Sequence, residues 1–316
     1  MGDNMAIKPE ECKVALLAGG TSGEREISQA SGDGAQKALE EAGFQVTRLD
    51  PAKQEDLKSL IADDYDVAFL CLHGKGGEDG TIQGMLQLIG LPYTGSGVLG
   101  SAIAIDKNRA KIMYASAGIP VIPGVALQID DERDLEAIKD ITGIPCVVKP
   151  ATEGSSLGLR IVQEEDELAE AIDYVFTVDD SIVIEKFVDG TETTCAILGN
   201  DELEALPVIE IVPLATNTYD FESKYAPGGC EHIIPARLSE EIVSKIQDYA
   251  KKAHKAVGCR GVSRTDFIVD SDGNPWILET NTIPGMTATS LLPDTAGVAG
   301  YSFPELCTKL VELALE

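Results

Sequence analysis

The chain has 316 residues, of which 44% are hydrophobic, enough for two or three domains with cores of their own. Acidic residues number 53 and basic residues 25, which gives a formal net charge of −28. Nucleic acids and anionic membranes both attract concentrated positive charge, so we expect neither as a partner.

The cysteines and the N-terminus indicate a soluble, cytoplasmic protein. Seven widely spaced cysteines form no C-x-x-C pair, as expected for free thiols in a reducing compartment rather than for zinc ligands or disulfides. The first residues are polar and acidic, without the apolar stretch of a signal peptide. Apolar runs stay shorter than the roughly 18 residues of a membrane-spanning helix.

Residues 13–105 alternate the patterns of strands and helices. Three short apolar segments predict strands, and the third is almost continuously apolar, as in a buried parallel sheet. The amphipathic stretches between and after them predict helices. This order is typical of a doubly wound, Rossmann-like α/β domain. The predicted strands are 13–18, 44–49 and 66–72, and the predicted helices end near Ala42 and span about 81–89.

Two glycine-rich loops follow the first and third of these strands, GGTSGERE at 19–26 and HGKGGEDG at 73–80. The first lacks the G-x-G-x-x-G spacing of a dinucleotide site, and the chain has no P-loop motif. Ligands of such sheets bind beyond the carboxyl ends of the strands, where Glu24 and His73 both fall. By position alone, Glu24 is equally compatible with an ordinary acid in the first turn of a helix. His73 is likewise compatible with a structural histidine bonded within its loop.

A change in sequence texture near 93–97 marks a predicted domain boundary. Positive charge gathers just after it, at Lys107, Arg109 and Lys111. A strand at 144–149 then ends in Lys149 and leads into the small-residue loop PATEGSSLG. The backbone N–H groups and hydroxyls of such a loop can approach phosphates closely. A plain glycine–serine turn remains the alternative for the loop considered alone.

The last part of the chain combines further strands with a long polar loop and two helices. The loop at 219–229 contains aromatic residues and shows no period, which suits a mobile lid over a site. One helix spans about 239–257, with His254 expected on its solvent side, and an amphipathic helix closes the chain at 301–316. The predicted strands before the C-terminal hairpin are 182–188, 193–198 and 205–211.

The C-terminal hairpin is predicted from strands at 262–269 and 275–280 around the turn-rich segment 270–274. Asp270 and Asp272 are interpreted as turn residues. A calcium-binding EF-hand loop is excluded, because the positions for its glycine and its bidentate glutamate hold Pro275 and Asn281.

Alternation along the hairpin strands brings four polar side chains together. Arg264 and Asp266 share one face, and Glu279 and Asn281 share a face of the return strand. A four-residue loop would place Asp266 across from Glu279, which is costly unless a cation lies between them. Two carboxylates and an amide oxygen suit Mg²⁺, which substrate phosphates usually complete. On spacing alone, a hairpin with a solvated acidic end is equally compatible. Trp276 and Leu278 are expected on the opposite face of the return strand.

Six sequence motifs, taken in order, resemble those of the D-alanine–D-alanine ligases, which belong to the ATP-grasp superfamily. One motif alone is a weak signal, but six in the family's order are hard to obtain by chance. The similarity covers roughly residues 13–312. The motifs are GGTSGERE, HGKGGEDG, KPATEGSSLG, EKFV, SKY, and RTD together with ETNTIPGMT.

The resemblance implies a fold and an activity. The implied fold is a Rossmann-like α/β domain followed by a two-lobed, α+β ATP-grasp part, divided into 1–96, 97–190 and 191–316. The implied activity is an ATP-dependent ligase that joins two D-alanines through a D-alanyl phosphate, giving D-alanyl-D-alanine for peptidoglycan precursors. The family also implies Mg²⁺ or Mn²⁺, as two ions, and a cytoplasmic homodimer with an interface in the first domain. Activation by a monovalent cation stays open.

The resemblance also implies a role for individual residues. The metal and the lysines would surround the transferring phosphoryl group, and Arg264 with the Gly285 N–H would stabilise the later oxyanion. Ser155 and Tyr225 would bond with Glu24 to close the lid. The implied residues are Glu24, Ser155, Tyr225, Arg264 and Gly285 for catalysis; His73, Ser290 and Leu291 for substrate binding; Lys107, Lys149, Glu185, Lys186, Val188, Glu192 and Lys224 for ATP; and Asp266, Glu279 and Asn281 for the metal.

Two departures and two alternatives accompany the resemblance. Thr280 and Ile283 stand where the family usually has alanine and serine, and we expect Thr280 to point away from Glu279. The stretch 261–263 lacks an aromatic residue that the family pattern leads us to expect. One alternative is a ligase whose second substrate is a hydroxy acid such as D-lactate, giving a depsipeptide. The other is a nucleotide-binding protein without catalysis.

Overall fold

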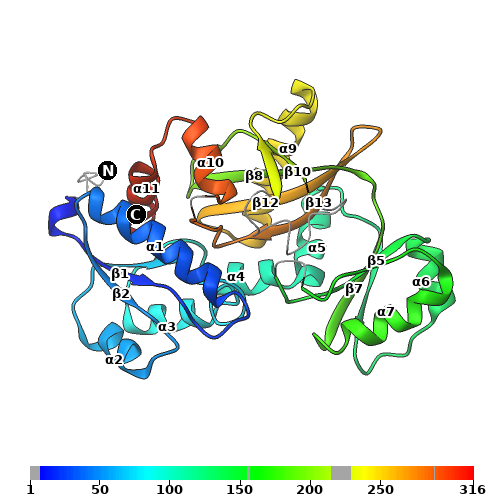
Figure 1. The fold of residues 1–316 in the computed structure, drawn as a ribbon, viewed down its shortest axis with the longest axis horizontal. Helices are drawn as coiled ribbons and strands as arrows, with labels where there is room; N and C mark the ends of the chain where they lie inside the picture. Colours follow the sequence, from blue (N-terminus) through cyan, green and yellow to red (C-terminus); the bar gives the residue numbers. More distant parts are fainter. Residues whose placement is uncertain (1–7, 155–156, 215–228, 288) are drawn as a thin grey trace.

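The computed structural model describes residues 8–154, 157–214, 229–287 and 289–316. Its elements form three groups (Figure 1). A small parallel sheet with helices on both faces lies at one end, and a four-stranded antiparallel sheet with two helices lies at the other. A larger antiparallel sheet lies between them. The fold class predicted from the sequence is confirmed.

The first group is built on three parallel strands in the order β2-β1-β3. Side chains of β1 alternate between two cores: Val14 and Leu16 pack towards α1 and α11, whereas Ala15 and Leu17 pack towards α2 and α3. The C-terminal helix α11 therefore returns to cover the first sheet. The elements are η1 Pro9–Glu11, β1 Lys13–Leu17, α1 Arg25–Glu41, β2 Gln45–Leu49, α2 Gln54–Ala62, β3 Val67–Leu70, α3 Thr81–Ile89 and α11 Phe303–Leu315.

The four-stranded sheet has the order β4-β7-β5-β6, with antiparallel neighbours throughout. Helices α6 and α7 cover one of its faces, and the other faces the centre of the molecule (Figure 1). Helices α4 and α5 lead into it from the first group. The elements are α4 Val98–Ile105, α5 Lys107–Ser116, β4 Gly124–Gln128, α6 Leu135–Thr142, β5 Cys146–Pro150, β6 Arg160–Val162, η2 Glu165–Glu167, α7 Leu168–Val175 and β7 Ser181–Lys186.

The central sheet has the order β11-β10-β8-β12-β13, with β9 pairing β8 at the side. One face is buried against α5 and α9, where Phe267 and Val269 contact Tyr114 and the apolar side of α9 in one core. The opposite face carries Asp266 and Ile268 and is turned towards the four-stranded sheet. The elements are β8 Gly190–Gly199, β9 Glu204–Ala205, β10 Ile209–Pro213, β11 Cys230–Ile233, α9 Glu240–Val257, β12 Gly261–Asp270, β13 Pro275–Asn281 and α10 Leu291–Val298.

The β12–β13 hairpin pairs Asp266 with Glu279, as predicted, and also pairs Arg264 with Asn281. The return strand, however, contains a β-bulge, because Phe267 pairs with Ile277 and Leu278 is the extra residue. The expectation that Trp276 and Leu278 face away from Glu279 is therefore wrong. Leu278 lines the same cavity as Glu279, and Trp276 pairs with Ile268, which also lines that cavity.

The environment of His254 also differs from the prediction. Its side chain is buried rather than on the solvent side of α9, and its Nδ1 lies 2.8 Å from the Ser263 hydroxyl on β12. Burial and the charge of Lys255 lower the pKa of His254 to about 4. His254 is thus a neutral core residue that joins α9 to the central sheet.

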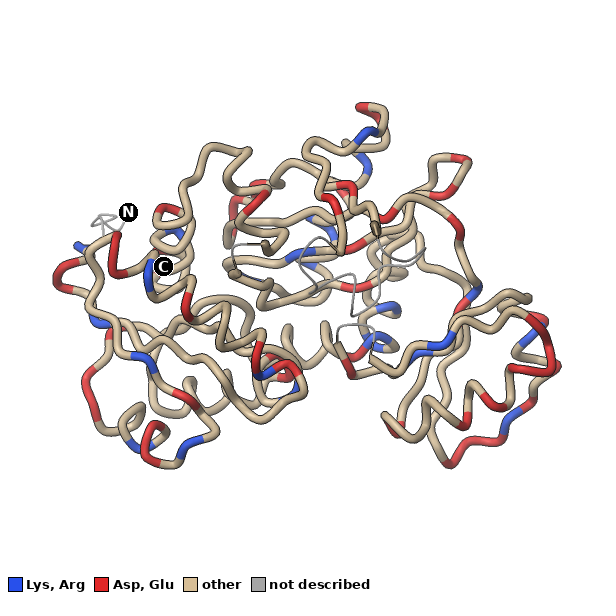
Figure 2. Tube along the Cα trace, in the orientation of Figure 1, with Lys and Arg blue, Asp and Glu red and all other residues tan. Residues whose placement is uncertain are grey.

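Two predictions from composition can be compared with the structure. All seven cysteines lie in the described part of the chain and are free thiols, as predicted. Within the described ranges, no helix has the length and apolar character needed to cross a membrane. Acidic residues are distributed over all three groups of elements, and several basic residues lie around the gap between the two antiparallel sheets (Figure 2).

Candidate active site

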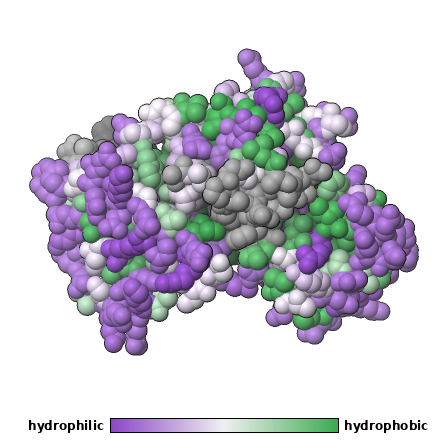
Figure 3. All heavy atoms as spheres, viewed as in Figure 1, coloured by the Kyte–Doolittle hydropathy of each residue, from purple (hydrophilic) through white to green (hydrophobic). Residues whose placement is uncertain are grey.

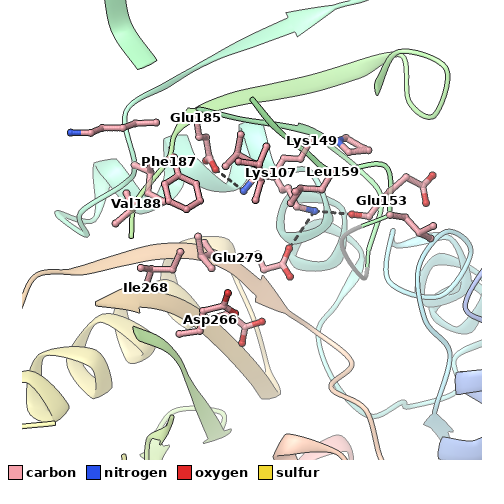
Figure 4. A pocket seen from close by; sticks show the side chains of 18 of the residues that line it. Lys107, Lys149, Glu153, Leu159, Glu185, Phe187, Val188, Asp266, Ile268 and Glu279 are labelled. Atoms are coloured by element: carbon pink, nitrogen blue, oxygen red, sulfur yellow. Dashed lines mark hydrogen bonds and ion pairs between the residues drawn. The ribbon is translucent and has the colours of Figure 1, made fainter. Parts of the chain in front are cut away.

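A cavity of about 230 Å³ lies between the four-stranded sheet and the central hairpin (Figure 4). Glu185, Phe187 and Val188 enter it from β7 and the segment that follows. Asp266, Ile268 and Glu279 enter from β12 and β13 on the opposite side. Of the seven residues predicted to bind ATP, six line this cavity, and Lys224 lies outside the described residues. The six are Lys107, Lys149, Glu185, Lys186, Val188 and Glu192.

Apolar side chains form much of the wall of this nucleotide-side cavity, and the sequence patterns did not identify them. They come from strands of both sheets and from the segments beside them, so only the tertiary structure brings them together. In Figure 3, hydrophobic residues are concentrated towards the middle of the molecule, whereas both ends are hydrophilic. The apolar lining includes Ile122, Val147, Leu159, Ile161, Ile211, Ile268 and Leu278.

Glu185 is held in a buried cluster of charges at the back of the cavity. Its carboxylate lies 2.5 Å from Lys111 Nζ and 2.6 Å from Lys149 Nζ. Burial alone would raise the pKa of Glu185, but the two lysines lower it below the usual value. Glu185 is therefore an anion held between two lysines. One carboxylate and two ammonium groups leave a net positive charge at this wall of the cavity. Lys111 was noted in the sequence only as part of a basic cluster.

Lys107 connects the small-residue loop after β5 with the residues that are candidates for binding the metal. Its Nζ donates to the Glu153 carbonyl at 2.8 Å and lies 3.3 Å from Glu279 Oε2. Lys107 opens α5, whose N-terminus is capped by the Asp106 carboxylate, and its own backbone N–H bonds to Ala151. Glu153 in turn pairs with Lys75 at 2.6 Å, so the loop after β5 is tied to the loop after β3.

Asp266, Glu279 and Asn281 lie together on the cleft face of the hairpin. Arg264 bonds both oxygens of Asp266, at 3.0 and 2.9 Å, and Thr194 donates to the same carboxylate at 2.5 Å. Asn281 Nδ2 lies 3.1 Å from Asp266 Oδ2. Thr280 points into the core, where it accepts from the Tyr114 hydroxyl. Two carboxylates and an amide on one face fit a hard divalent cation whose remaining ligands come from phosphate oxygens.

A second cavity, of about 480 Å³, lies between the first sheet and the hairpin. It is lined by all the described residues that were predicted for substrate binding or catalysis, and Ser155 and Tyr225 lie outside the described residues. Glu279 lines this substrate-side cavity, the nucleotide-side cavity and a small space of about 40 Å³ between them. The predicted residues in the second cavity are Glu24, His73, Arg264, Gly285, Ser290 and Leu291.

His73 and Glu78 contribute titratable groups to the substrate-side cavity from the loop after β3. His73 Nε2 lies 3.2 Å from the Ser31 hydroxyl, and burial with the charge of Arg264 lowers the pKa of His73 to about 4. Glu78 accepts from the Gly74 and Ile283 backbone N–H groups at 2.9 and 3.3 Å. Burial and the nearby Glu24 carboxylate raise the pKa of Glu78 to about 8.

Glu78 was not selected from the sequence, although it lies inside the motif HGKGGEDG. Its place in this motif was the only signal available in the sequence. The fold alone brings Glu78 close to Glu24 and Ile283. A neutral carboxyl group beside an anionic one is typical of functional sites.

A turn before α10 presents hydroxyl and backbone groups at the far end of the second cavity. Ser290 accepts from the Thr287 backbone N–H at 3.0 Å and lies 2.8 Å from the Thr287 hydroxyl. A Cβ at Gly285 would come within 2.7 Å of the Ser290 Oγ, so this approach favours glycine. Met286 donates its backbone N–H to Ser31, which fixes the turn against α1.

Comparison with known proteins gives a consistent result. A family model described as D-ala D-ala ligase C-terminus matches residues 113–312, and one described as D-ala D-ala ligase N-terminus matches residues 50–96. A D-alanine–D-alanine ligase from Syntrophobacter fumaroxidans is 52% identical over 98% of this chain and 100% of its own. One from Desulfotalea psychrophila is 48% identical over 98% of this chain and 97% of its own.

Solved structures are similar over nearly the same length. The crystal structure of D-alanine–D-alanine ligase from Bacillus anthracis superimposes with a TM-score of 0.84 at 33% identity, covering 96% of this chain and 97% of that chain. The structure of the same enzyme complexed with ATP has a TM-score of 0.82 at 32% identity, with the same coverage.

Proposed function

The chain belongs to the D-alanine–D-alanine ligase family, and on this premise we propose how its cleft performs the reaction. It joins two D-alanines while ATP becomes ADP and phosphate, and the product D-alanyl-D-alanine serves peptidoglycan synthesis. We assign the reaction to this cleft because Glu279 lies where the nucleotide-side and substrate-side cavities meet. A phosphoryl group can pass between two ligands only at such a junction.

The reaction has two steps. A carboxylate oxygen of the first D-alanine attacks the γ-phosphorus of ATP, and the bond to ADP breaks, leaving a D-alanyl phosphate. The second D-alanine loses an ammonium proton to a nearby acceptor or water, and its amine attacks the acyl carbon. Phosphate then leaves, and the new peptide nitrogen releases its extra proton in the same way. Both steps concentrate negative charge between the cavities, so cationic and N–H groups are required there.

ATP is assigned to the cavity between the two antiparallel sheets. The apolar walls accept the adenine, with hydrogen bonds from the backbone of Lys186 and Val188. Glu185 and Glu192 serve the adenine and ribose edges. Lys107 and Lys149 lie towards the phosphates, where each is already anchored by a carboxylate. Lys224 completes the set in this proposal.

A divalent cation, Mg²⁺ or Mn²⁺, is assigned to Asp266, Glu279 and Asn281, and the family pattern suggests two ions. When bound, it supplies positive charge that neutralises the phosphates and polarises the γ-phosphoryl group. The protein's part is to hold the two carboxylates and the amide on one rigid hairpin face. Arg264 orients Asp266 through its two bonds.

The two D-alanines are assigned to the substrate-side cavity. Glu24 accepts the ammonium of the first, and His73, neutral in its buried position, lies near the carboxylate. Ser155 and Tyr225 are assigned to the hydrogen bonds with Glu24 that close the lid.

The second substrate's carboxylate is assigned to Ser290 and the backbone of Leu291. Leu291 opens α10, and the N–H groups at a helix N-terminus favour an anion. Arg264 and the Gly285 N–H stabilise the oxyanion that forms when the amine attacks.

We also propose the division of the chain into 1–96, 97–190 and 191–316, with α11 of the last part returning to pack on the first sheet. We further propose a cytoplasmic homodimer, with the first domain at its interface. Leu88 on α3 is 90% exposed, and Leu99 on the adjoining α4, just after the first domain, is 72% exposed. The two helices contact each other, which supports this apolar face as the place where a second copy of the chain binds. Light scattering on L88E/L99E should give a monomer where the wild type gives a dimer.

Phosphate release from ATP and Mg²⁺, measured with D-alanine, L-alanine, D-lactate or no acceptor, tests the function. We expect release that requires D-alanine and a dipeptide of the expected mass. Release with D-lactate and formation of a depsipeptide would overturn the second-substrate assignment. ATP binding without release for any acceptor would favour the non-catalytic alternative.

A further inference from the structure

Three side chains beside the cleft form a chain of hydrogen bonds that the ligase reaction does not use. They are Cys230 and His232 on β11 and Asp294 on α10. Cys230 Sγ lies 3.4 Å from His232 Nε2, and His232 Nδ1 lies 2.6 Å from Asp294 Oδ2. A nucleophile, a base and a group that orients the base occur in this order in thiol-dependent active sites.

The local structure explains why the three groups meet. Residues two apart on a strand share a face, so Cys230 and His232 point to the same side of β11. Asp294 lies one turn after Leu291 on α10, so both side chains face this edge of the sheet. The arrangement therefore rests on two regular elements.

The carboxylate of Asp294 fixes the tautomer of His232. A carboxylate accepts hydrogen bonds, so the short contact places the imidazole proton on Nδ1 and leaves Nε2 as an acceptor facing the thiol. Burial and the Asp294 charge raise the pKa of the Cys230 thiol. Because the raised pKa disfavours loss of the proton to water, a thiolate forms here only when His232 takes the proton. Asp294 then balances the positive charge of His232.

The thiol is also connected to both cavities of the cleft. Cys230 packs against an apolar cluster of Ile209, Ile211 and Leu291. Ile211 lines the nucleotide-side cavity, and Leu291 lines the substrate-side cavity. A group added to the partly buried Cys230 lies beside this cluster, and crowding there shifts side chains that line both cavities.

We propose that Cys230 is a modification site, at which a peroxide converts the thiol to a sulfenic acid and thereby inhibits the protein. His232 Nε2 takes the thiol proton, and the thiolate sulfur attacks one oxygen of the peroxide. The S–O bond forms as the O–O bond breaks, so sulfur is oxidised and the peroxide is reduced. For hydrogen peroxide, the departing hydroxide recovers the proton from His232 and leaves as water.

The first experiment follows the chemistry itself and is independent of the proposed function. The full chain is treated with hydrogen peroxide and dimedone, and labelled peptides are quantified by mass spectrometry over time. Cys259 serves as a comparison thiol that bonds with the hydroxyls of Ser96 and Ser263. Because it is more deeply buried than Cys230, the decisive comparison is between the wild type and H232Q.

We expect labelling at Cys230 before Cys259, and labelling of Cys230 about tenfold slower in H232Q. D294N should slow it to a smaller extent. Equal rates at the two cysteines, or a rate unchanged in H232Q, would overturn the proposal. Circular dichroism of each variant checks that the fold is retained.

The second experiment measures D-alanine-dependent phosphate release before and after the same treatment. The wild type and C259A should lose activity as Cys230 becomes labelled, and C230A or C230S should retain it. Labelling of Cys230 without loss of activity would overturn the inhibition, as would equal loss in C230A. Reduction with dithiothreitol should restore the wild type treated with hydrogen peroxide alone, because thiols reduce a sulfenic acid but do not cleave the thioether that dimedone forms with it.

Discussion

The two main cavities of the cleft are charged in different ways. The nucleotide-side cavity contains a carboxylate that two lysines compensate, and its other walls are apolar. The substrate-side cavity brings the carboxyl groups of Glu24 and Glu78 together, and burial with the Glu24 charge raises the pKa of Glu78 to about 8. The nucleotide-side cavity therefore combines apolar walls with fixed lysines, as ATP requires, whereas the substrate-side cavity contains carboxyl groups, as expected for the ammonium group that we propose there.

This difference explains how a strongly acidic chain can bind ATP. The net charge of −28 is spread over the surface, while lysines are fixed by buried partners where phosphates are expected. Local placement of a few cations, rather than the overall charge, decides which anion the cleft accepts.

The largest effect is expected at the junction of the cavities. E279Q removes a carboxylate that belongs to both sides and that lies 3.3 Å from Lys107. We expect D-alanine-dependent phosphate release to fall at least about a thousandfold. Glu132→Gln, at an exposed position, is the control and should leave the rate unchanged. A rate in E279Q close to that of the wild type would mean that the reaction does not depend on the carboxylate that the two cavities share.

A change confined to the substrate side should separate binding from catalysis. R264A removes the two bonds to Asp266 and one oxyanion partner, so kcat should fall about a hundredfold or more. Arg264 does not line the described part of the nucleotide-side cavity, so ATP affinity measured by calorimetry without a divalent cation, when Asp266 has no ion to hold, should change little. Loss of ATP binding as large as the loss of kcat would contradict the division into two sides.

A change confined to the nucleotide side should act on ATP affinity and stability. K111M leaves Glu185 with Lys149 alone, and we expect unfolding in urea to show a loss of roughly 1–3 kcal/mol with weaker ATP binding. The double variant K111M/E185Q should recover stability but not ATP binding. K245M, at an exposed helix position, serves as the control. A double variant as unstable as K111M would refute the charge-pair explanation.

The raised pKa of Glu78 predicts a specific pH dependence of stability. Its ordinary value is 4.5 and its folded value about 8, so the folded state keeps a proton that the unfolded state releases between these values. The contribution of neutral Glu78 is complete below the lower value and is lost as the pH rises through the upper one. Glutamine stays neutral, so the melting temperature of E78Q relative to the wild type should increase between about pH 5 and about pH 9. A constant difference over this range would disprove the assignment.

The smallest effect is expected at the tip of the hairpin. Asp270 accepts from the backbone of Asp272 and Asn274 and from Trp276 Nε1, which makes it a turn residue, as interpreted from the sequence. These bonds lower the pKa of Asp270 to about 2. D270N should leave the activity unchanged, and the measured phosphate release should match the wild type. A clear loss of activity would extend the functional site beyond both cavities.

Alternation and capping signals made much of the fold predictable. The helix α3 was predicted with its observed bounds. The pairing of Asp266 with Glu279 was also predicted, but the assumed four-residue loop is one residue too long, since Val269 pairs with Pro275, and the bulge at Leu278 compensates for the difference. Helix α10 was not predicted, because Gly297 within Leu291–Val298 disfavours a helix in isolation and Pro293 is compatible with one only in its first turn. Its helical form depends on packing against the sheet and α11.

The candidate site was predictable where a motif carried the residue. The bulge at Leu278 gave no signal, since the run from Trp276 to Leu278 is apolar throughout. His254 was misplaced because a polar residue type was assumed to face solvent, whereas Ser263 provides its partner in the core. Glu78 acquires its unusual pKa from groups that only the folded chain brings near. Residue type and spacing thus predict which groups are present, but tertiary neighbours decide how they ionise.

The bulge in β13 also determines where this hairpin can change length during evolution. Because Leu278 is an extra residue, two successive side chains face the cleft, one against the nucleotide-side cavity and one at the junction. Deleting one residue there would restore strict alternation and turn one of the two away from its ligand. The exposed turn at 271–273 carries no such constraint, so insertions should accumulate at the tip of the hairpin and not at its catalytic end.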